Sequence, residues 1–380
     1  MGLEVELLDG IAGLEPAAWN ALVGGESPFL EWEWLASLEE AGCVGGDTGW
    51  EPRPLVVRDG ERLVAACPLY AKQHSEGEFV FDWGWADAAH RAGLDYYPKW
   101  LVGVPFTPVG GARLLAAPGV ERSQAAVWLG DALRELCERS GLSGVHLNFC
   151  APDEVEALRE RGWMLRVGLQ YHWRNADYAS FEDYLGHLKS KRRNQVRRER
   201  RAVREAGVEV VALRGDAIGD DLFEPLFQCY RTTVDTHFYG RRYLNRRFFE
   251  LLRERFRHRL CFVVARRDGE LLAGTTNVEK GDALYGRYWG ALHPVRHLHF
   301  EVCYYAAIEH CIASGLARFE PGAGGEYKFL RGFDPEPTYS LHFLRHPGLS
   351  RAVEKFLEAE RAEAARTLDV LTAHSQLKPI

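Results

Sequence analysis

Two short motifs each occur twice in this chain of 380 residues, once in each half and in the same order. The first, Asp-Gly-Glu-x-Leu, begins at Asp59 and again at Asp268, each time between two apolar runs, which is typical of a β-hairpin turn. The second, Cys-x-x-Ser-Gly-Leu, begins at Cys137 and again at Cys311, and it places a glycine where a helix is expected to end. The repetition predicts two related domains, 1–175 and 176–380.

The patterns of apolar residues predict the same order of elements in both halves: helices, then antiparallel hairpin strands, then a helix and a strand. In the second half we expect helices at 182–188, 191–206, 222–237, 244–255, 301–314 and 351–371, and strands at 208–213, 260–266, 271–278, 284–289 and 317–319. The stretch 79–99 is rich in aromatic residues, and we expect it to be irregular. The fold class is therefore α/β, of the α+β kind with a mixed sheet, and no glycine fingerprint of a dinucleotide fold follows a strand.

The N-terminus, the apolar stretches and the cysteines indicate the cellular compartment of the protein. The N-terminus lacks the basic segment and apolar run of a signal peptide, and no apolar stretch reaches the roughly 20 residues of a membrane span. The eight cysteines are scattered singly, with no pair at C-x-x-C spacing, which favours reduced and buried thiols over a zinc or redox motif. We therefore expect a cytoplasmic protein.

The net charge of −7 hides a strongly basic segment. Residues 189–204 contain nine Lys or Arg and one acidic residue, Glu199. On a helix, five arginines of this segment fall along one face, and the first four are the candidate phosphate contacts: Arg193, Arg197, Arg200, Arg201 and Arg204. One interpretation is a solvated face paired with the acidic remainder of the chain. The other is a track for the phosphates of a tRNA or of a nucleotide-bearing donor, because arginine binds phosphate through two parallel hydrogen bonds.

A strand, a loop and the start of a helix follow one another between residues 285 and 301. The unpaired N–H groups at a helix start attract anions, so this order predicts a phosphate site. The residues expected to bind the donor here are Tyr288, Trp289, Gly290, Arg296, His297, His299 and Glu301. Two histidines and a glutamate are also metal-ligand types, but the turn from loop to helix takes them off one shared face, so no metal site is expected. A purely structural role for these histidines is the alternative.

Glycines are concentrated just beyond the short strand 317–319, where they allow positive φ and a close approach of the backbone to a ligand. Amide-forming transfer needs a base for the proton of the attacking amine and a positive charge or N–H dipoles for the developing oxyanion. Glu320 or Glu326 is the candidate base, and Lys328 is the candidate partner of the oxyanion. The acceptor cleft is expected to be lined by Gly322, Gly324, Gly325, Arg331 and His342. The alternative is a surface turn with ordinary charges.

Several blocks together carry a family resemblance: Pro105-Phe106-Thr107-Pro108, Gln170-Tyr171-His172-Trp173, Lys191-Arg192-Arg193, Arg287-Tyr288-Trp289-Gly290, Leu298-His299-Phe300-Glu301, and 322–328 with Arg331-Gly332-Phe333. They resemble the FemAB-like group of predicted N-acyltransferases, which is often labelled peptidoglycan biosynthesis or recognition proteins. The resemblance extends from about Phe29 to His346, most of the chain.

The resemblance implies tandem domains of the GNAT-like acyltransferase fold, with the transfer site in the second. In GNAT enzymes the loop before the key helix holds the diphosphate of coenzyme A and is rich in glycine, whereas here Pro294 and two histidines fill it. The related Fem aminoacyl transferases carry an amino acid from aminoacyl-tRNA to an amine of a peptidoglycan precursor. Both acyl-CoA and aminoacyl-tRNA therefore remain open as the co-substrate, and no permanently bound cofactor is expected.

The residues and the resemblance together predict an N-acyltransferase. In this hypothesis an amine of a small molecule or a peptide attacks the carbonyl of the activated donor directly, and tRNA is a possible partner. The alternative belongs to a different class: a non-catalytic module that recognises cell-wall peptide or an acidic polymer.

Overall fold

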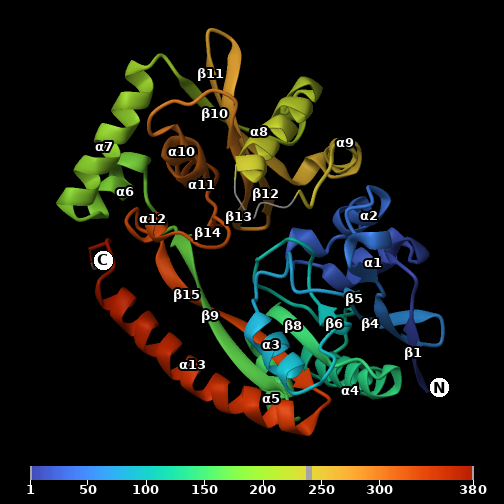
Figure 1. The fold of residues 1–380 in the computed structure, drawn as a ribbon. Helices are drawn as coiled ribbons and strands as arrows, with labels where there is room; N and C mark the ends of the chain where they lie inside the picture. The colour runs from blue at the N-terminus through green and yellow to red at the C-terminus, as the bar shows by residue number, and fades with distance from the viewer. Residues whose placement is uncertain (1, 237–241, 379–380) are drawn as a thin grey trace. The chain divides into compact units, whose positions relative to one another are not determined.

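The computed structural model describes residues 2–236 and 242–378 of the chain (Figure 1). The chain forms two compact units: unit 1 is Met1–Leu169 with Pro337–Thr367, and unit 2 is Gln170–Glu336 with Leu368–Ile380. The sequence repeat placed 337–367 in the second half. In the structure these residues are part of unit 1, because a late strand pairs there with a strand of the first half.

Unit 1 contains two sheets. The smaller sheet has the order β1-β3-β4-β7: β1 (Leu3–Leu7), β3 (Leu55–Asp59), β4 (Arg62–Cys67) and β7 (Leu115–Ala116). The larger sheet has the order β15-β8-β6-β5-β2: β15 (Asp334–Leu344), β8 (Gly144–Cys150), β6 (Lys99–Val102), β5 (Leu69–Lys72) and β2 (Trp50–Pro52). β6 and β8 are parallel and the other pairs of this sheet are antiparallel, so the sheet is mixed.

The helices of unit 1 are α1 (Pro16–Val23), α2 (Trp32–Glu40), α3 (Trp83–Arg91), α4 (Arg122–Ser140) and α5 (Pro152–Arg159). α4 packs its apolar face, including Leu129 and Leu133, against the larger sheet. α3 lies inside the stretch that was expected to be irregular. It forms because Trp85 and Ala89, four residues apart, are buried together against other parts of unit 1, a tertiary contact that overrides the weak local pattern.

Unit 2 is built on strands in the order β10-β11-β12-β13-β14-β9: β10 (Glu209–Arg214), β11 (Leu260–Arg267), β12 (Glu270–Lys280), β13 (Ala283–Ala291), β14 (Arg318–Glu320) and β9 (Met164–Arg174). Only residues 170–174 of β9 belong to unit 2. β13 and β14 are parallel, and the other pairs are antiparallel. The helices are α6 (Phe181–His187), α7 (Ser190–Glu205), α8 (Phe223–Thr236), α9 (Arg246–Arg255), α10 (Leu298–Phe300), α11 (Ala306–Ser314) and α12 (Glu326–Phe329). Residue 237, the expected end of the helix that became α8, lies outside the described residues.

Three further kinds of element complete the chain. A π-helical turn, Glu301–Tyr305, joins α10 to α11. The long helix α13 (Pro347–Ala373), red in Figure 1, begins in unit 1, where Leu349 and Val353 are buried. Short 3₁₀ turns occupy Ile11–Gly13, Pro28–Leu30, Gly46–Thr48, Gly215–Ala217, Asp220–Leu222 and Arg257–Arg259. Among the described residues, no helix is long and apolar enough to cross a membrane.

The repeated motifs adopt the local structures expected from the sequence. Each Asp-Gly pair lies in the turn of an antiparallel hairpin, β3–β4 in unit 1 and β11–β12 in unit 2. Gly141 ends α4 at φ 72° and Gly315 ends α11 at φ 66°, both in the left-handed region that favours glycine. The expected α/β class with mixed sheets is confirmed.

Candidate functional site

The two parallel strands of unit 2 separate partway along their length. Tyr285 of β13 pairs with Glu320 of β14, and β14 ends there, while β13 continues beside β12 to Ala291. The glycine-rich loop that follows β14 lies against β13, since a Cβ on Gly322 would be 3.3 Å from the carbonyl oxygen of Gly286. Three glycines of this loop, Gly322, Gly324 and Gly325, have positive φ. The expectation that the loop uses glycine for its backbone conformation is therefore confirmed.

Lys328 of α12 holds this loop from inside. Its side chain is buried, and its Nζ donates hydrogen bonds to the carbonyl oxygens of Gly322 at 2.5 Å and Ala323 at 3.0 Å. Burial, opposed by Cys303 and assisted by Arg287, lowers the pKa of Lys328 to about 8. The loop thus surrounds an ammonium group that is charged at neutral pH and close to losing its proton.

Glu320 lies at the end of β14 and is buried. Its Oε1 accepts a hydrogen bond from Arg318 Nε at 3.1 Å, and its Oε2 lies 3.8 Å from Nε2 of His172 on β9. Neither Glu320 Oε2 nor His172 Nε2 has a hydrogen-bond partner in the described part of the chain. Two buried polar atoms without a hydrogen-bond partner can each accept or donate a hydrogen bond to a substrate atom that reaches them.

The protonation of this pair follows from its burial. Burial raises the pKa of Glu320 to about 7, although Arg318 opposes the shift. Burial, together with the nearby charges of Arg174 and Arg318, lowers the pKa of His172 to about 3. At neutral pH, therefore, a neutral imidazole faces a carboxyl group that exchanges its proton readily, which is the property of a general base. Glu326, the other candidate base, is exposed in the first turn of α12.

Arg331 is engaged in internal contacts. Its guanidinium forms an ion pair with Glu199 of α7 at 2.9 Å, donates to the Tyr305 hydroxyl at 2.7 Å, and lies 3.5 Å from the centroid of the Phe300 ring. Although burial opposes it, hydrogen bonds from Tyr305, Gln195 and Arg331 hold the pKa of Glu199 below its usual range. Arg331 therefore connects α7 to the turn between α10 and α11, which keeps the loop and the helix start in place.

The start of α10 carries part of the expected donor site. His297 caps the helix at φ 67°, its carbonyl oxygen accepts the N–H groups of Phe300 and Glu301, and Arg296 beside it is exposed. His299 packs its ring against Trp289 with centroids 4.6 Å apart, and burial lowers the pKa of His299 to about 4. Arg296 is thus the expected donor residue of this turn whose charged side chain is exposed.

The other three expected donor residues have different surroundings. Tyr288 packs against Tyr230 of α8, with ring centroids 5.2 Å apart. Gly290 lies directly under α8, because a Cβ there would be 1.7 Å from the carbonyl oxygen of Cys229. Glu301 forms an ion pair with Arg200 of α7 at 2.9 Å. The structure therefore does not bring all seven residues to one point.

The four arginines expected to contact phosphate on α7 also differ in their surroundings. Arg197 pairs with Glu182, and Arg200 pairs with Glu301 and with Glu309 at 2.7 Å. Arg193 donates to the Gly186 carbonyl oxygen at 3.4 Å, and Arg201 is exposed. Two of the four arginines thus fit the interpretation of a face paired with acidic residues.

His342, expected at the acceptor cleft, belongs to unit 1. Its Nδ1 lies 2.8 Å from Nδ1 of His146, and both rings are buried. Glu320 and Lys328 belong to unit 2, so His342 and these two residues are in different units.

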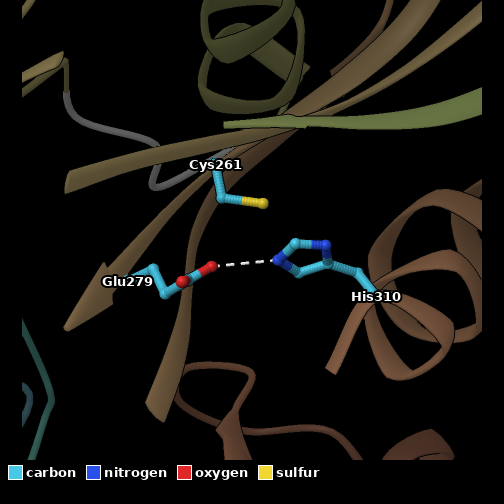
Figure 2. A group of neighbouring side chains, drawn as sticks. All are labelled: Cys261, Glu279 and His310. Carbon is cyan, nitrogen blue, oxygen red and sulfur yellow. Dashed lines mark hydrogen bonds and ion pairs between the residues drawn. The ribbon is translucent and has the colours of Figure 1, made fainter. Parts of the chain in front are cut away.

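One group in the described residues has the composition of a metal site. Cys261, Glu279 and His310 place their ligand atoms within 4.8 Å of one another, and Figure 2 shows the sulfur pointing toward the same space as the other two side chains. Sulfur, nitrogen and oxygen ligands suit Zn²⁺. Here, however, Glu279 binds His310 at 2.9 Å and Arg214 at 2.9 Å, and burial raises the pKa of the Cys261 thiol to about 12. Internal hydrogen bonds and ion pairs therefore account for the arrangement.

Sequence reasoning did not assign a role to His172 or Arg318. His172 was noted as part of a block on one strand, but its position opposite Glu320 follows from the pairing of β9 with β14, in which Trp173 faces Phe319. The two strands are far apart in the sequence. Only the alternation of Arg318 with Glu320 on a short strand hinted that both side chains share a face.

A family model named FemAB-like, described as peptidoglycan biosynthesis/recognition, matches residues 10–379. The solved structure of FemX matches with a TM-score of 0.56 and 10% identity, over 90% of this chain and 98% of that one. L-PGS from Bacillus licheniformis matches with a TM-score of 0.51 and 10% identity, over 93% and 97%. A tandem GNAT protein from the clavulanic acid biosynthesis pathway matches with a TM-score of 0.47 and 14% identity, over 91% and 99%. No curated protein sequence matches the chain significantly.

Proposed function

The chain belongs to the FemAB-like family, and from this premise we propose that it is an N-acyltransferase that moves an acyl or aminoacyl group from an activated donor to an amine. The observation that carries the proposal is the pair of unpartnered buried atoms, Glu320 Oε2 and His172 Nε2, at the end of β14 beside the glycine-rich loop. A carboxyl group whose pKa is about 7 suits the task of taking a proton from an attacking amine at neutral pH.

The reaction proposed is direct attack. The acceptor nitrogen attacks the acyl carbon of the donor, a C–N bond forms, and the C–S bond of a thioester or the C–O bond of an aminoacyl ester breaks. Glu320 takes the proton of the attacking nitrogen and returns it to the leaving sulfur or oxygen. Lys328, whose ammonium lies inside the loop, supplies the positive charge that stabilises the developing oxyanion.

The donor is held by its phosphates in this proposal. The supporting features are the exposed Arg296 at the start of α10 and the exposed Arg201 of α7. Acyl-CoA and aminoacyl-tRNA both carry such phosphates, and the names of the structures similar to this one, FemX and L-PGS, do not decide between them. The test therefore uses both donors.

The test measures transfer from labelled acetyl-CoA and from labelled alanyl-tRNA to a muramyl pentapeptide precursor with a free lysine amine. One donor is expected to support transfer, and Glu320→Gln is expected to lower its rate by about 100-fold or more, because the amide cannot accept the proton. Glu209→Gln, which changes an exposed carboxylate on β10, is the matched control and should keep full activity.

Two results would contradict the proposal. Full activity of Glu320→Gln would remove Glu320 as the base. Binding of the precursor without transfer from either donor would favour the alternative, a module that recognises cell-wall peptide.

A further inference from the structure

The larger sheet of unit 1 is polar on one buried face. Across neighbouring strands of this face, Lys72 lies directly opposite Lys99, and His146 lies directly opposite His342. Asn148 follows on the same face of β8, opposite Ser340 of β15. The alternate residues of the same strands are apolar and form the core with α4, as expected for a sheet that packs on helices. A second face that is also buried, but polar, requires another explanation.

The segment between β5 and β6 covers part of this face and adds two carboxylates. Lys99 Nζ donates to Ser75 Oγ at 2.9 Å, to Glu78 Oε2 at 2.9 Å and to Asp82 Oδ2 at 2.5 Å. The three donors of this ammonium are therefore all used. The Tyr96 hydroxyl also donates to Asp82 Oδ2, at 2.6 Å. We call Lys99, Glu78, Asp82, His146 and Asn148 the unit 1 polar cluster.

Five atoms of the unit 1 polar cluster have no hydrogen-bond partner within the described ranges: Glu78 Oε1, Asp82 Oδ1, His146 Nε2, and both Nδ2 and Oδ1 of Asn148. All four residues are at most 5% exposed. Glu78, Asp82 and His146 are close together, since Glu78 and Asp82 meet at Lys99 and the Tyr96 ring, bonded to Asp82, has its centroid 6.1 Å from that of His146. Asn148 is the next residue after His146 on the same face of β8. Each buried polar atom without a partner lowers stability, and such atoms are rare unless a ligand or water completes them.

Each charged group of the cluster has a partner of opposite charge, and burial raises the pKa of Glu78 to about 7, so this carboxyl group is only partly ionised at neutral pH. Lys99 lies between the two carboxylates and pairs with both. Burial lowers the pKa of His146 to about 3 and moves the pKa of His342 well below its usual range, so both rings are neutral. A ligand with a net charge would therefore find no unpaired opposite charge. The atoms without partners include a carboxylate oxygen that accepts and an amide that both donates and accepts.

We propose that the unit 1 polar cluster is a ligand-binding site, separate from the residues proposed for transfer, and that it takes an uncharged ligand through hydroxyl or amide groups. Hydroxyl and amide groups each supply a donor and an acceptor without adding charge. Two sources have this chemistry, the hydroxyls of a sugar and the amides of a peptide.

The first test uses stability and needs no ligand. Asn148→Leu replaces an amide without partners by an apolar group of similar size, so the melting temperature of the full chain should rise. Asn277→Leu is the matched comparison, because Asn277 is equally buried but its amide donates to the Cys261 carbonyl oxygen at 3.1 Å and to Thr275 Oγ1 at 2.9 Å. The melting temperature of Asn277→Leu should therefore fall. A fall of similar size in Asn148→Leu would show a structural role for Asn148 and overturn the proposal.

The second test uses two uncharged probes, the disaccharide of N-acetylglucosamine and N-acetyl-alanyl-alanine amide, with calorimetry and with crystals of the full chain. One probe should bind with density at Asn148 and Asp82, and Asn148→Leu should weaken its binding by about 10-fold or more, the discrimination typical of a site left with unpaired polar groups. Ordered water alone at the cluster, with no binding of either probe, would overturn the proposal. Neither test depends on transfer activity, so a failure here is distinct from a failure of the proposed function.

Discussion

At the scale of the residue, burial determines the chemistry of the candidate site. Glu320 and Glu326 are the same residue type in the same segment, and only the first is buried. The burial places the pKa of Glu320 near 7 and leaves one of its oxygens facing His172. The identity of a base is thus a property of the surroundings of a carboxyl group, which a sequence motif does not contain.

The first prediction concerns pH. Because Glu320 acts when it has lost its proton and Lys328 acts while it keeps its own, the transfer rate should rise as the pH increases through about 7 and fall again above about 8. The pKa of Glu320 is raised by burial from the ordinary value of about 4.5 to about 7, so the folded state binds this proton more tightly than the unfolded chain does. Stability should therefore fall as the pH rises between about 4.5 and 7. The pH profile of the transfer rate measures the first effect. The melting temperatures of the unchanged chain and of Glu320→Gln, compared across the same pH range, measure the second.

The same pH profile can contradict the role of Glu320. A rate profile that stays flat between pH 5 and 8 while the unchanged chain transfers normally would exclude Glu320 as the titrating base. The control is His258→Ala, which removes an exposed titratable group of unit 2 and should leave the profile in place.

At the scale of the element, close packing of α8 on β13 and β12 supports the strand that borders the site. Gly290 and Gly274 lie in register on the two strands, and each faces α8. The absence of a Cβ at these two positions lets the helix backbone approach the sheet. The strand that carries Tyr288 and Trp289 is held in place by this contact.

The second prediction tests that contact. Gly290→Ala should destabilise unit 2 by about 3 kcal/mol, because the new Cβ would meet the Cys229 carbonyl oxygen, a backbone atom that cannot move aside. Gly186→Ala in α6 is the control: no atom lies within 4 Å of its new Cβ, so its stability should stay equal or increase by up to about 1 kcal/mol. Denaturant unfolding measures both, and equal stability of the two variants would contradict the packing argument.

At the scale of the whole molecule, each unit contains a segment from the end of the chain. Unit 1 includes 337–367, and unit 2 includes 368–380. Within unit 2, the Lys189 N–H donates to the Gln376 carbonyl oxygen at 2.9 Å, and Ser375 Oγ donates to Asp334 at 2.6 Å. The terminal segment therefore contributes to the stability of unit 2.

The third prediction follows from these contacts. Deletion of residues 374–380 should speed hydrogen exchange in α6 and α7, because the bonds to Lys189 and the packing of Leu377 against the core of unit 2 are lost. Exchange in α4 of unit 1 should not change. Glu358→Ala, at an exposed position of α13, is the control and should leave α6 and α7 protected. Unchanged exchange in α6 and α7 after the deletion would contradict a contribution of the terminal segment.

The sequence by itself determined what depends on neighbours along the chain. The apolar periods predicted α7, α9 and the hairpins, and the Asp-Gly and Ser-Gly signals predicted the turns and the helix ends. The motif blocks predicted the family, which the match to the family model confirms. What depends on pairing between distant segments was decided only by the tertiary structure. The position of His172 opposite Glu320, the return of 337–367 to unit 1, and the polar face of the unit 1 sheet all follow from strand pairing, which local patterns do not encode. The repeated motifs thus marked the hairpins and the helix ends, while burial by distant segments decided which carboxylates became chemically distinct.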